Sequence, residues 1–242
     1  MRTIDGFDCW TVAPRAEKAT TAVVYLHGGG YFQQIVSQHW RLIGQLADAG
    51  VHVEVPLYGL APHHHWREAY GLVTTVYRQV LDRFDAITVA GDSAGGGLAL
   101  GFAQSLLDSP LPQPRRIVLI APWLDLALAE PGVAAVQRRD PWLVGAGARR
   151  AGLVWAAGAD LTDPRLSPIH GELRGLAPKS LWFGTRDILY PDAVRLRRRA
   201  DAVDAELTLT VCQDAIHVYP LVPAPEGRAA ARAIVREIGW GG

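Results

Sequence analysis

Cysteine, methionine and lysine are all scarce in this chain of 242 residues. The two cysteines, Cys9 and Cys212, are too few for the crosslinked scaffold of a small secreted domain, and we expect two separate thiols. Arginine carries nearly all of the basic charge, yet 24 acidic residues balance the 24 basic ones and the formal net charge is zero. We therefore expect no nucleic-acid partner, because no overall positive field is present.

Long apolar runs are missing as well. No run reaches the roughly 18 residues that a membrane helix needs. The first residues, Met1–Asp8, lack the basic and apolar regions of a secretory signal. We therefore expect a cytoplasmic protein without a membrane span. Hydrophobic residues still make up 49% of the chain and charged residues 20%, which is enough apolar material for a full core.

Short apolar runs alternate with longer amphipathic stretches along the chain. The middle runs are nearly continuous hydrophobics, which is typical of parallel strands covered on both faces. The predicted strands are Ala22–Leu26, Val51–Val55, Ile87–Gly91, Ile117–Ala121, Ser180–Gly184 and Leu207–Cys212. The predicted helices are Ser37–Ala49, Trp66–Phe84, Ala94–Leu107, Gly145–Ala157, Pro191–Asp204 and Glu226–Ile238. This alternation predicts an α/β fold with a mostly parallel central sheet and helices on both faces, and Cys9–Ala13 is expected to add an antiparallel edge strand.

The longest interruption of this pattern covers residues 123–178. An excursion of this length between two strands is usually functional or a small subdomain. We interpret it as an insertion in one domain that covers residues 1–242. Trp123, Trp142 and Trp155 lie in or beside it. We expect most of them to pack the insertion on the core and at least one to face a ligand cleft.

Residues Gly91-Asp92-Ser93-Ala94-Gly95 fit the pattern G-x-S-x-G. They follow one predicted strand and open the next predicted helix, which is the context that a nucleophile turn requires. Gly91 and Gly95 give the sharp turn the small residues that it needs. The alternative is a glycine-rich turn with an ordinary N-cap serine, but the context favours Ser93 as a nucleophile.

A second glycine motif, His27-Gly28-Gly29-Gly30, directly follows the strand Ala22–Leu26. Three consecutive glycines leave backbone N–H groups uncovered, so that they can donate to a developing oxyanion. An HGGG loop together with a G-x-S-x-G turn is typical of lipases and esterases. Their joint occurrence, each after a strand, argues against an ordinary flexible loop.

A serine nucleophile needs a histidine to take its proton. Two histidines follow Ser93, His170 and His217. His217 comes shortly after the strand Leu207–Cys212, at the carboxyl edge of the predicted sheet. His170 lies in the insertion, upstream of the best acid, which breaks the chain order Ser, acid, His of α/β-hydrolases. We predict His217 as the base.

The histidine in turn needs a carboxylate to orient it. Asp187 follows the strand Ser180–Gly184 at the same edge, where α/β sheets place their sites. Asp192 begins a predicted helix and is better explained as a first-turn acid. Asp214 is too close in sequence to His217 to come from a separate loop. We predict Asp187 as the acid.

The run His63-His64-His65 suggests a metal site at first sight. Adjacent side chains point in different directions, and no cysteine or acidic ligand set lies nearby at helical spacing. We interpret the run as a solvated loop and predict neither a metal nor a cofactor.

Together these residues resemble the hormone-sensitive-lipase-like family of carboxylesterases, the α/β-hydrolase fold-3 group. The resemblance extends from about Val23 to His217. Softer matches are Tyr58-Gly59-Leu60-Ala61-Pro62 and Asp163-Pro164-Arg165-Leu166-Ser167-Pro168. It implies an α/β-hydrolase fold with Ser93, Asp187 and His217 as the triad. It also implies that the backbone N–H groups of Gly29, Gly30 and Ala94 form the oxyanion hole, with His27, Gly28, Gly91 and Gly95 as supporting residues.

The sequence departs from the family pattern in three places. Only about twenty residues precede the strand Ala22–Leu26, which leads into the motif His27-Gly28-Gly29-Gly30. We therefore expect a reduced cap and a more open pocket. His63 stands where a glutamate is usual, and Val218 where a glycine commonly follows the histidine. The resemblance implies a serine esterase that acts on small-molecule esters with short acyl chains, including esters of bulky alcohols such as sterols. The alternatives are an amide or formamide hydrolase and a non-catalytic binding module.

Overall fold

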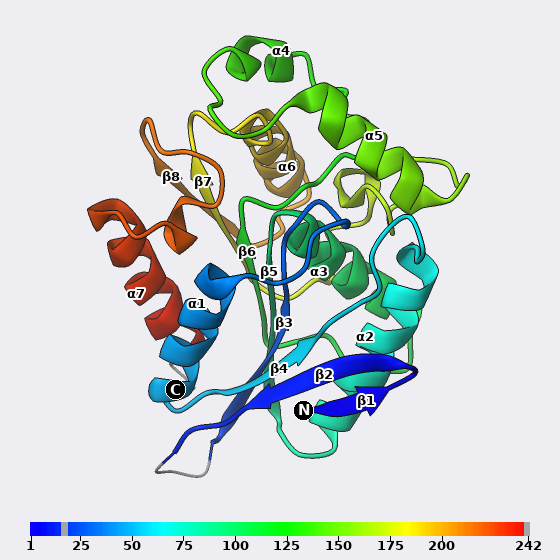
Figure 1. The fold of residues 1–242 in the computed structure, drawn as a ribbon, viewed down its shortest axis with the longest axis vertical. Coiled ribbons are helices and arrows are strands. Elements are labelled where there is room, and N and C mark those ends of the chain that lie inside the picture. The colour runs from blue at the N-terminus through cyan, green and yellow to red at the C-terminus, as the bar shows by residue number, and fades with distance from the viewer. Residues whose placement is uncertain (16–18, 240–242) are drawn as a thin grey trace.

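The computed structural model describes residues 1–15 and 19–239 of the chain. Its centre is an eight-stranded sheet in the order β1-β2-β4-β3-β5-β6-β7-β8, drawn in Figure 1. Strands β3 to β8 run parallel to their neighbours, β2 is antiparallel to β4, and β1 is antiparallel to β2. The strands are β1 (Arg2–Ile4), β2 (Phe7–Val12), β3 (Thr21–Leu26), β4 (His52–Pro56), β5 (Ala86–Asp92), β6 (Arg116–Ile120), β7 (Lys179–Gly184) and β8 (Leu207–Cys212).

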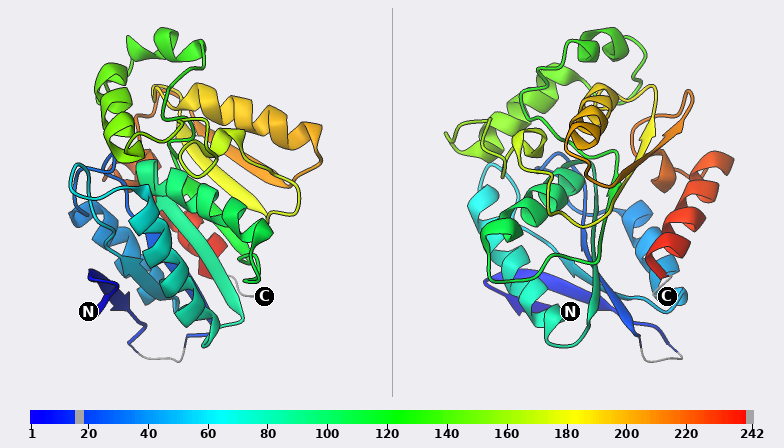
Figure 2. Two further views of the ribbon diagram at one scale, coloured as in Figure 1. Left: turned by 90° about the vertical axis from the view of Figure 1, so that its right-hand side faces the viewer. Right: turned by 180° about the vertical axis from the view of Figure 1, so that it is seen from behind.

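Helices cover both faces of this sheet. Helices α1 and α7 lie side by side on one face, and α2, α3 and α6 cover the other (Figures 1 and 2). The helices are α1 (Ser37–Asp48), α2 (Trp66–Leu81), α3 (Ser93–Ser105), α4 (Gly132–Gln137), α5 (Gly145–Ala156), α6 (Tyr190–Ala202) and α7 (Pro225–Gly239). The predicted α/β fold with a mostly parallel sheet is confirmed.

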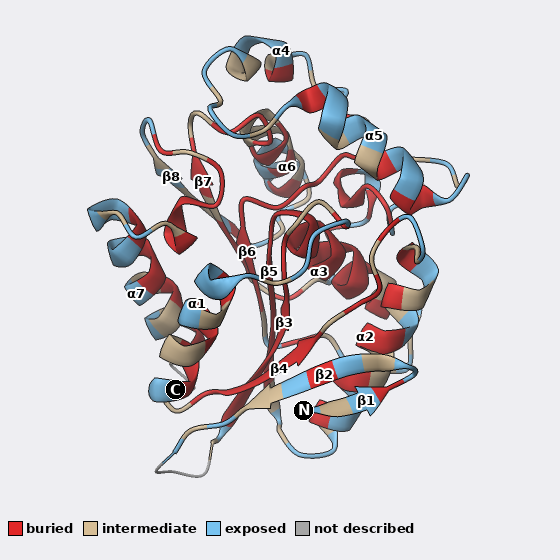
Figure 3. Cartoon of the chain, viewed as in Figure 1, coloured by how far each residue is buried: buried red, intermediate tan, exposed pale blue. Residues whose placement is uncertain are grey.

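Burial explains why most residues of the central strands are apolar; the buried polar pair in β4, His52 and Glu54, is hydrogen-bonded at 2.7 Å. Every residue of β3 and β4 is buried, as are all residues of β5 and β6 except the first of each. Figure 3 shows this buried material along the sheet, with exposed residues on the outer sides of the helices. Because helices pack on both faces, a strand at the centre has no solvent-facing side for polar residues.

Among the strands and α-helices of the described residues, β1 and α4 were not predicted, and one strand lies elsewhere than expected. Strand β1 has three residues and helix α4 has six, which is too short for a periodic pattern to show. Because β1 pairs with β2, the strand expected at Cys9–Ala13 is second from the edge and not at it. Cys9 and Cys212 lie in β2 and β8, near opposite edges of the sheet, and both are free thiols as predicted.

The insertion at residues 123–178 lies above the carboxyl edge of the parallel strands. Helices α4 and α5 form its outer part (Figure 1). Leu124, Leu126, Val133 and Trp155 from this segment are buried in the same hydrophobic cluster as the strand residues. This shared core supports the interpretation of a single domain that carries an insertion. Within the described residues, no helix has the length and apolar character that crossing a membrane requires.

Candidate active site

Ser93 lies at a sharp turn where β5 ends and α3 begins. Its backbone is left-handed, with φ of 50°, which is rare and costly for a residue with a Cβ and is a recurrent feature of functional sites. A Cβ at Gly95 would collide with the backbone carbonyl oxygens of Leu26 and His27, and one at Gly91 with the backbone of Gly95. The close approach of β3 to this turn therefore requires glycine at both positions.

His217 and Asp187 complete a hydrogen-bonded chain with this serine. His217 Nε2 lies 2.9 Å from Ser93 Oγ, and His217 Nδ1 lies 2.7 Å from Asp187 Oδ2. The three residues follow β5, β7 and β8, whose carboxyl ends meet at one edge of the sheet. The structure thus brings together the three residues that the sequence predicted as a triad.

Burial and the neighbouring Asp187 have opposite effects on the pKa of His217. Burial alone would lower the pKa of this imidazole, since a charged ring loses its hydration. The negative charge of Asp187 and its hydrogen bond outweigh burial and raise the pKa of His217 above the ordinary 6.5. An imidazole whose charged form is favoured in this way is suited to accept a proton from Ser93 Oγ.

The rival residues lie outside this chain of hydrogen bonds. His170 is exposed at the end of a 3-10 helix in the insertion. Asp214 is mostly exposed and forms an ion pair with Arg139 at 2.7 Å. Asp192 is fully buried in the first turn of α6, and neither of its carboxylate oxygens has a hydrogen-bond partner among the described residues.

We predict that Asp192→Asn flattens the pH dependence of stability. Burial, with the nearby charge of Asp125, raises the pKa of Asp192 from 3.8 to about 7. The folded state therefore holds a proton that the unfolded chain releases, and its stability falls as pH rises between these values. With about 1.4 kcal/mol per pH unit, the loss amounts to about 4 kcal/mol.

Urea unfolding of both proteins between acidic and mildly alkaline pH measures this effect. Over that range, the fall in the free energy of unfolding should be about 2–4 kcal/mol smaller in the variant than in the wild type. Asp201→Asn is the matched control, because Asp201 lies on the same helix with an exposed carboxylate. Parallel stability curves for wild type and Asp192→Asn would contradict the assignment of a raised pKa to this carboxyl group.

The loop after β3 places its glycine amides beside Ser93. Gly29 and Gly30 have positive φ values of 124° and 60°, and both residues line the same cavity as Ser93 and His217. Among the described residues, neither amide donates a hydrogen bond to a protein acceptor. The amide of Ala94 is in the first turn of α3, where N–H groups have no partner within the helix. These donors are therefore available to an oxygen bound at Ser93.

Asp92, the residue between Gly91 and Ser93, joins the two glycine motifs. Its buried carboxylate accepts hydrogen bonds from the amide of Gly28 at 2.9 Å and from the hydroxyl of Tyr25 at 2.8 Å. Its other oxygen lies 3.2 Å from Nε2 of His39. The roles of Asp92 and His39 were not predicted from the sequence. An acidic residue inside an otherwise small and apolar motif was the only available signal for Asp92, and none marked His39.

His27 supports the same loop as a neutral side chain. Burial lowers the pKa of His27 to about 4. Its Nδ1 lies 2.6 Å from the carbonyl oxygen of Gly28, so the proton of the neutral ring is on Nδ1. The ring stacks on Tyr58 with centroids 4.6 Å apart, and the Tyr58 hydroxyl donates to the His27 carbonyl. These contacts hold the backbone that precedes the free amides.

A cavity of about 640 Å³ opens over Ser93 and His217. Trp123 and Trp142 line it, and Trp142 packs edge-on against His217 at a centroid distance of 5.9 Å. Trp155 stacks on Tyr31 in the core at 4.4 Å. Trp123 also lies in the hydrophobic core and stacks on Tyr31 at 5.8 Å. Two of the three tryptophans thus pack on the core and two line the cavity, in line with both parts of the expectation.

The mouth of this cavity is apolar and open to solvent. Phe32, Val36, Trp142 and Val144 line it and are each about half exposed or more. An accessible apolar rim is consistent with the expected open pocket, and it favours substrates with an apolar part.

Asp140 ties the insertion to the loop that carries Asp187. One of its oxygens accepts a hydrogen bond from the amide of Ile188 at 2.9 Å, and the other accepts from the amides of Trp142 and Leu143. Asp140 thereby holds the segment with Trp142 against the residue that follows Asp187. This connection between distant segments was not predicted from the sequence.

Val218 follows His217 with φ of 45°. This left-handed conformation is unfavourable for a β-branched residue and accessible to glycine. It accounts for the glycine that commonly stands at this position in the family that the sequence resembles. The buried Val218 side chain lines the cavity instead.

Three comparisons relate the chain to known proteins. A family model described as alpha/beta hydrolase fold matches residues 23–221. The acetyl-hydrolase of Streptomyces hygroscopicus is 34% identical over 227 residues, covering 90% of this chain and 75% of the relative. The esterase of Acinetobacter venetianus is 32% identical over 198 residues, covering 78% of this chain and 64% of the relative.

A hormone-sensitive lipase from a metagenome library has a similar solved structure. Its TM-score is 0.92 with 27% identity, covering 98% of this chain and 82% of that one. These findings agree with the family that the two glycine motifs indicated.

Proposed function

The chain belongs to the α/β-hydrolase-fold family of hormone-sensitive-lipase-like carboxylic ester hydrolases, and from this we propose that Ser93, His217 and Asp187 hydrolyse short-acyl esters through an acyl-enzyme. The observation that carries the proposal is the continuous chain of hydrogen bonds from Ser93 through His217 to Asp187. A buried serine beside an imidazole with an orienting carboxylate is the arrangement that activates a hydroxyl as a nucleophile.

In the proposed mechanism, His217 takes the proton of Ser93 as its Oγ attacks the ester carbonyl. The backbone amides of Gly29, Gly30 and Ala94 donate to the oxyanion of the tetrahedral intermediate. His217 then protonates the leaving alcohol, and Ser93 remains acylated. Water, deprotonated by His217, attacks the acyl group, the carboxylic acid leaves, and Ser93 regains its proton.

Three features support a short acyl group and a larger alcohol. One relative is named an acetyl-hydrolase. The cavity volume of about 640 Å³ lies within the range of pockets that hold drug-sized ligands. The apolar side chains at its mouth offer contacts to a bulky apolar alcohol, of which a sterol is one example.

Labelling with a fluorophosphonate probe tests the proposed nucleophile. We expect one adduct per chain, located by peptide mass spectrometry on the peptide that contains Ser93, and blocked by prior incubation with substrate. Labelling elsewhere, or none, would contradict the role of Ser93.

A panel of p-nitrophenyl esters from acetyl to octanoyl, extended with an acetylated sterol, tests the substrate class. We expect the highest kcat/KM with the shortest acyl groups. Aryl formamides and dipeptide amides in the same panel test the amide alternative, and preferential cleavage of these amides would overturn the assignment as an esterase.

A further inference from the structure

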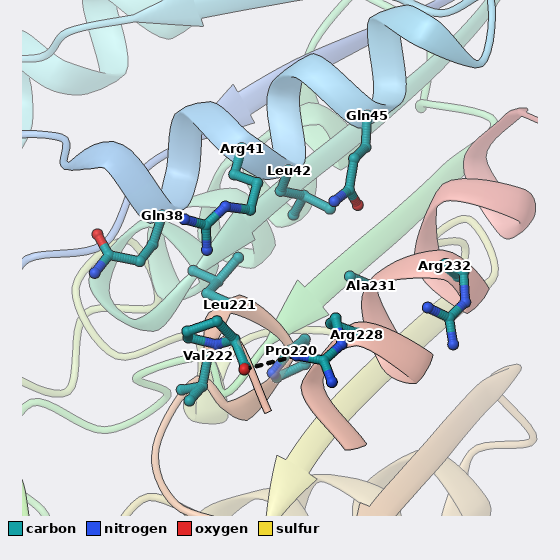
Figure 4. Close-up of a pocket in the computed structure, with 11 residues that line it drawn as sticks. Gln38, Arg41, Leu42, Gln45, Pro220, Leu221, Val222, Arg228, Ala231 and Arg232 are labelled. Carbon is teal, nitrogen blue, oxygen red and sulfur yellow. Dashed lines mark hydrogen bonds between the residues drawn. The ribbon is translucent and has the colours of Figure 1, made fainter. Parts of the chain in front are cut away.

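A second cavity of about 320 Å³ lies between α1, α7 and the loop that follows His217, shown in Figure 4. We call it the arginine groove. From α1 it is lined by Gln38, Arg41, Leu42 and Gln45; from the loop by Pro220, Leu221, Val222 and Pro223; and from α7 by Arg228, Ala231 and Arg232. None of these residues belongs to the proposed catalytic machinery.

The charge of the arginine groove is positive and unbalanced. Arg41, Arg228 and Arg232 contribute three guanidinium groups, and no lining residue is acidic. Arg228 donates a hydrogen bond to the carbonyl oxygen of Pro223 at 2.8 Å. Within the described part of the chain, Arg41 and Arg232 have no acidic partner within ion-pair distance. Since the whole chain is electrically neutral, this is a local excess of positive charge.

The lining of the groove combines buried apolar residues with exposed arginines. Leu42, Leu221 and Ala231 are buried, whereas Arg41, Arg228 and Arg232 are exposed. Figure 4 shows the Arg41 side chain extending from α1 toward the loop with Leu221 and Val222. Exposed guanidinium groups beside buried apolar side chains suit a ligand that has an aliphatic part and an anionic end, such as a carboxylate or a phosphate.

The arginine groove adjoins the cavity over Ser93. Gln38, Leu221, Val222 and Pro223 line both spaces. The loop that separates them begins at His217, the proposed base, and Leu221 follows it by four residues. A substrate bound at Ser93 can therefore extend past Leu221 and Val222 to the arginines without leaving the protein surface.

We propose that the arginine groove binds an anionic group carried by the ester substrate, so that the preferred substrates are esters with a carboxylate or phosphate at a distance from the reacting carbonyl. This inference rests on the proposed function, because it assigns a substrate class to the same site. The anion is recognised by charge-assisted hydrogen bonds from Arg41, which extends toward the loop, while Arg232 adds positive charge on the side of α7 and Arg228, held by the Pro223 carbonyl, shapes the groove.

The test compares two pairs of substrates. In the first pair, the mono-p-nitrophenyl ester of suberic acid is set against the same ester with its free carboxylate replaced by a primary amide. In the second pair, the acetate ester of a hydroxyalkyl phosphate is set against the acetate of the uncharged diol. The first pair places the anion on the acyl side and the second on the alcohol side.

We expect the wild-type protein to favour the anionic member of at least one pair by about tenfold in kcat/KM, the size of one charge-assisted hydrogen bond. Added salt should reduce this preference, because the Debye length shrinks to about 3 Å at 1 M. The double variant Arg41→Gln, Arg232→Gln should lose about tenfold in kcat/KM on the anionic ester, with less than about a twofold change on the neutral one.

Two controls separate charge from damage to the fold. Arg236→Gln removes one positive charge from α7 at an exposed position that does not line the groove, and it should keep the preference. The double variant Arg41→Lys, Arg232→Lys keeps both positive charges and should keep part of the preference for the anionic ester. It provides the test if the glutamine variant does not fold.

The outcomes are distinguishable. Equal kcat/KM for both members of both pairs, or a preference unchanged in the double variant, overturns the inference and leaves the proposed function standing. Hydrolysis of no ester, with no fluorophosphonate labelling, overturns both. Binding of the wild type to phosphatidylglycerol vesicles, lost in the double variant and without an anionic-ester preference, would assign the arginines to a lipid surface and overturn the substrate role.

Discussion

Replacing Ser93 with alanine should lower kcat for p-nitrophenyl acetate by about 10⁴–10⁶-fold, the range seen when the nucleophile of such a triad is removed. The loss is this large because no covalent intermediate forms, and His217 then has no hydroxyl to activate. Among the described residues, the Ser93 side chain makes one hydrogen bond, at 2.9 Å with His217, so the protein should fold as before.

Steady-state kinetics at saturating substrate measure the loss, and thermal unfolding reports the fold. Ser105→Ala is the matched control, because Ser105 lies at the end of the same helix and its hydroxyl donates to the Phe102 carbonyl. It should keep wild-type activity. Hydrolysis by Ser93→Ala within tenfold of the wild-type rate would refute the role of Ser93 as nucleophile.

Replacing Asp187 with asparagine should lower kcat by about 10⁴-fold. Asp187 is fully buried, and its two oxygens accept hydrogen bonds from His217 Nδ1 at 2.7 Å and from the amide of Leu189 at 2.9 Å. An amide group that donates toward Nδ1 would favour the tautomer with its proton on Nε2. That nitrogen then cannot accept the proton of Ser93.

The same substitution should move the acid limb of the pH–rate profile to lower pH. Only neutral His217 can act as a base, so kcat/KM falls as pH drops through its pKa. In the wild type that midpoint lies above 6.5, since the charge of Asp187 outweighs burial. Without that charge, burial predominates and the pKa of His217 falls.

The pH dependence of kcat/KM for both proteins measures this shift. Asp192→Asn serves as its control, because that carboxylate lies outside the hydrogen-bonded chain, and it should leave the midpoint in place. An unchanged midpoint in Asp187→Asn, or a shifted one in Asp192→Asn, would show that another acid tunes His217.

The elements that could be predicted are those whose residue pattern is itself the cause of the structure. Strands β3, β5 and β6 consist mostly of apolar residues because helices cover both of their faces. The helices that connect the strands along the chain provide this cover. The turn at Ser93 could be recognised from the sequence because the neighbouring backbone leaves no room for a Cβ at Gly91 or Gly95, so both positions must be glycine. The short elements β1 and α4 lacked enough residues for any pattern.

The candidate site divides in the same way. The sequence alone predicted Ser93, Asp187 and His217 at one edge of the sheet, because each follows a predicted strand and parallel strands bring their carboxyl ends together. The supporting contacts could not be read in advance. Asp92 reaches His39 across 53 positions of the chain, and Asp140 reaches Ile188 across 48. No local pattern encodes which distant residue such a carboxylate meets.

The near absence of cysteine excluded a disulfide scaffold, and the balanced charge excluded a globally basic protein. The glycine motifs determined the family. The sequence was sufficient here because these properties depend on composition or on a few consecutive residues. The tertiary structure alone decided the raised pKa of Asp192, the left-handed backbone of Val218 and the arginine groove. Each of these depends on which surfaces α1, α6, α7 and the loop after β8 bring together. The packing of helices against a sheet settles that arrangement, so a globally neutral chain can still concentrate three arginines beside its proposed active site.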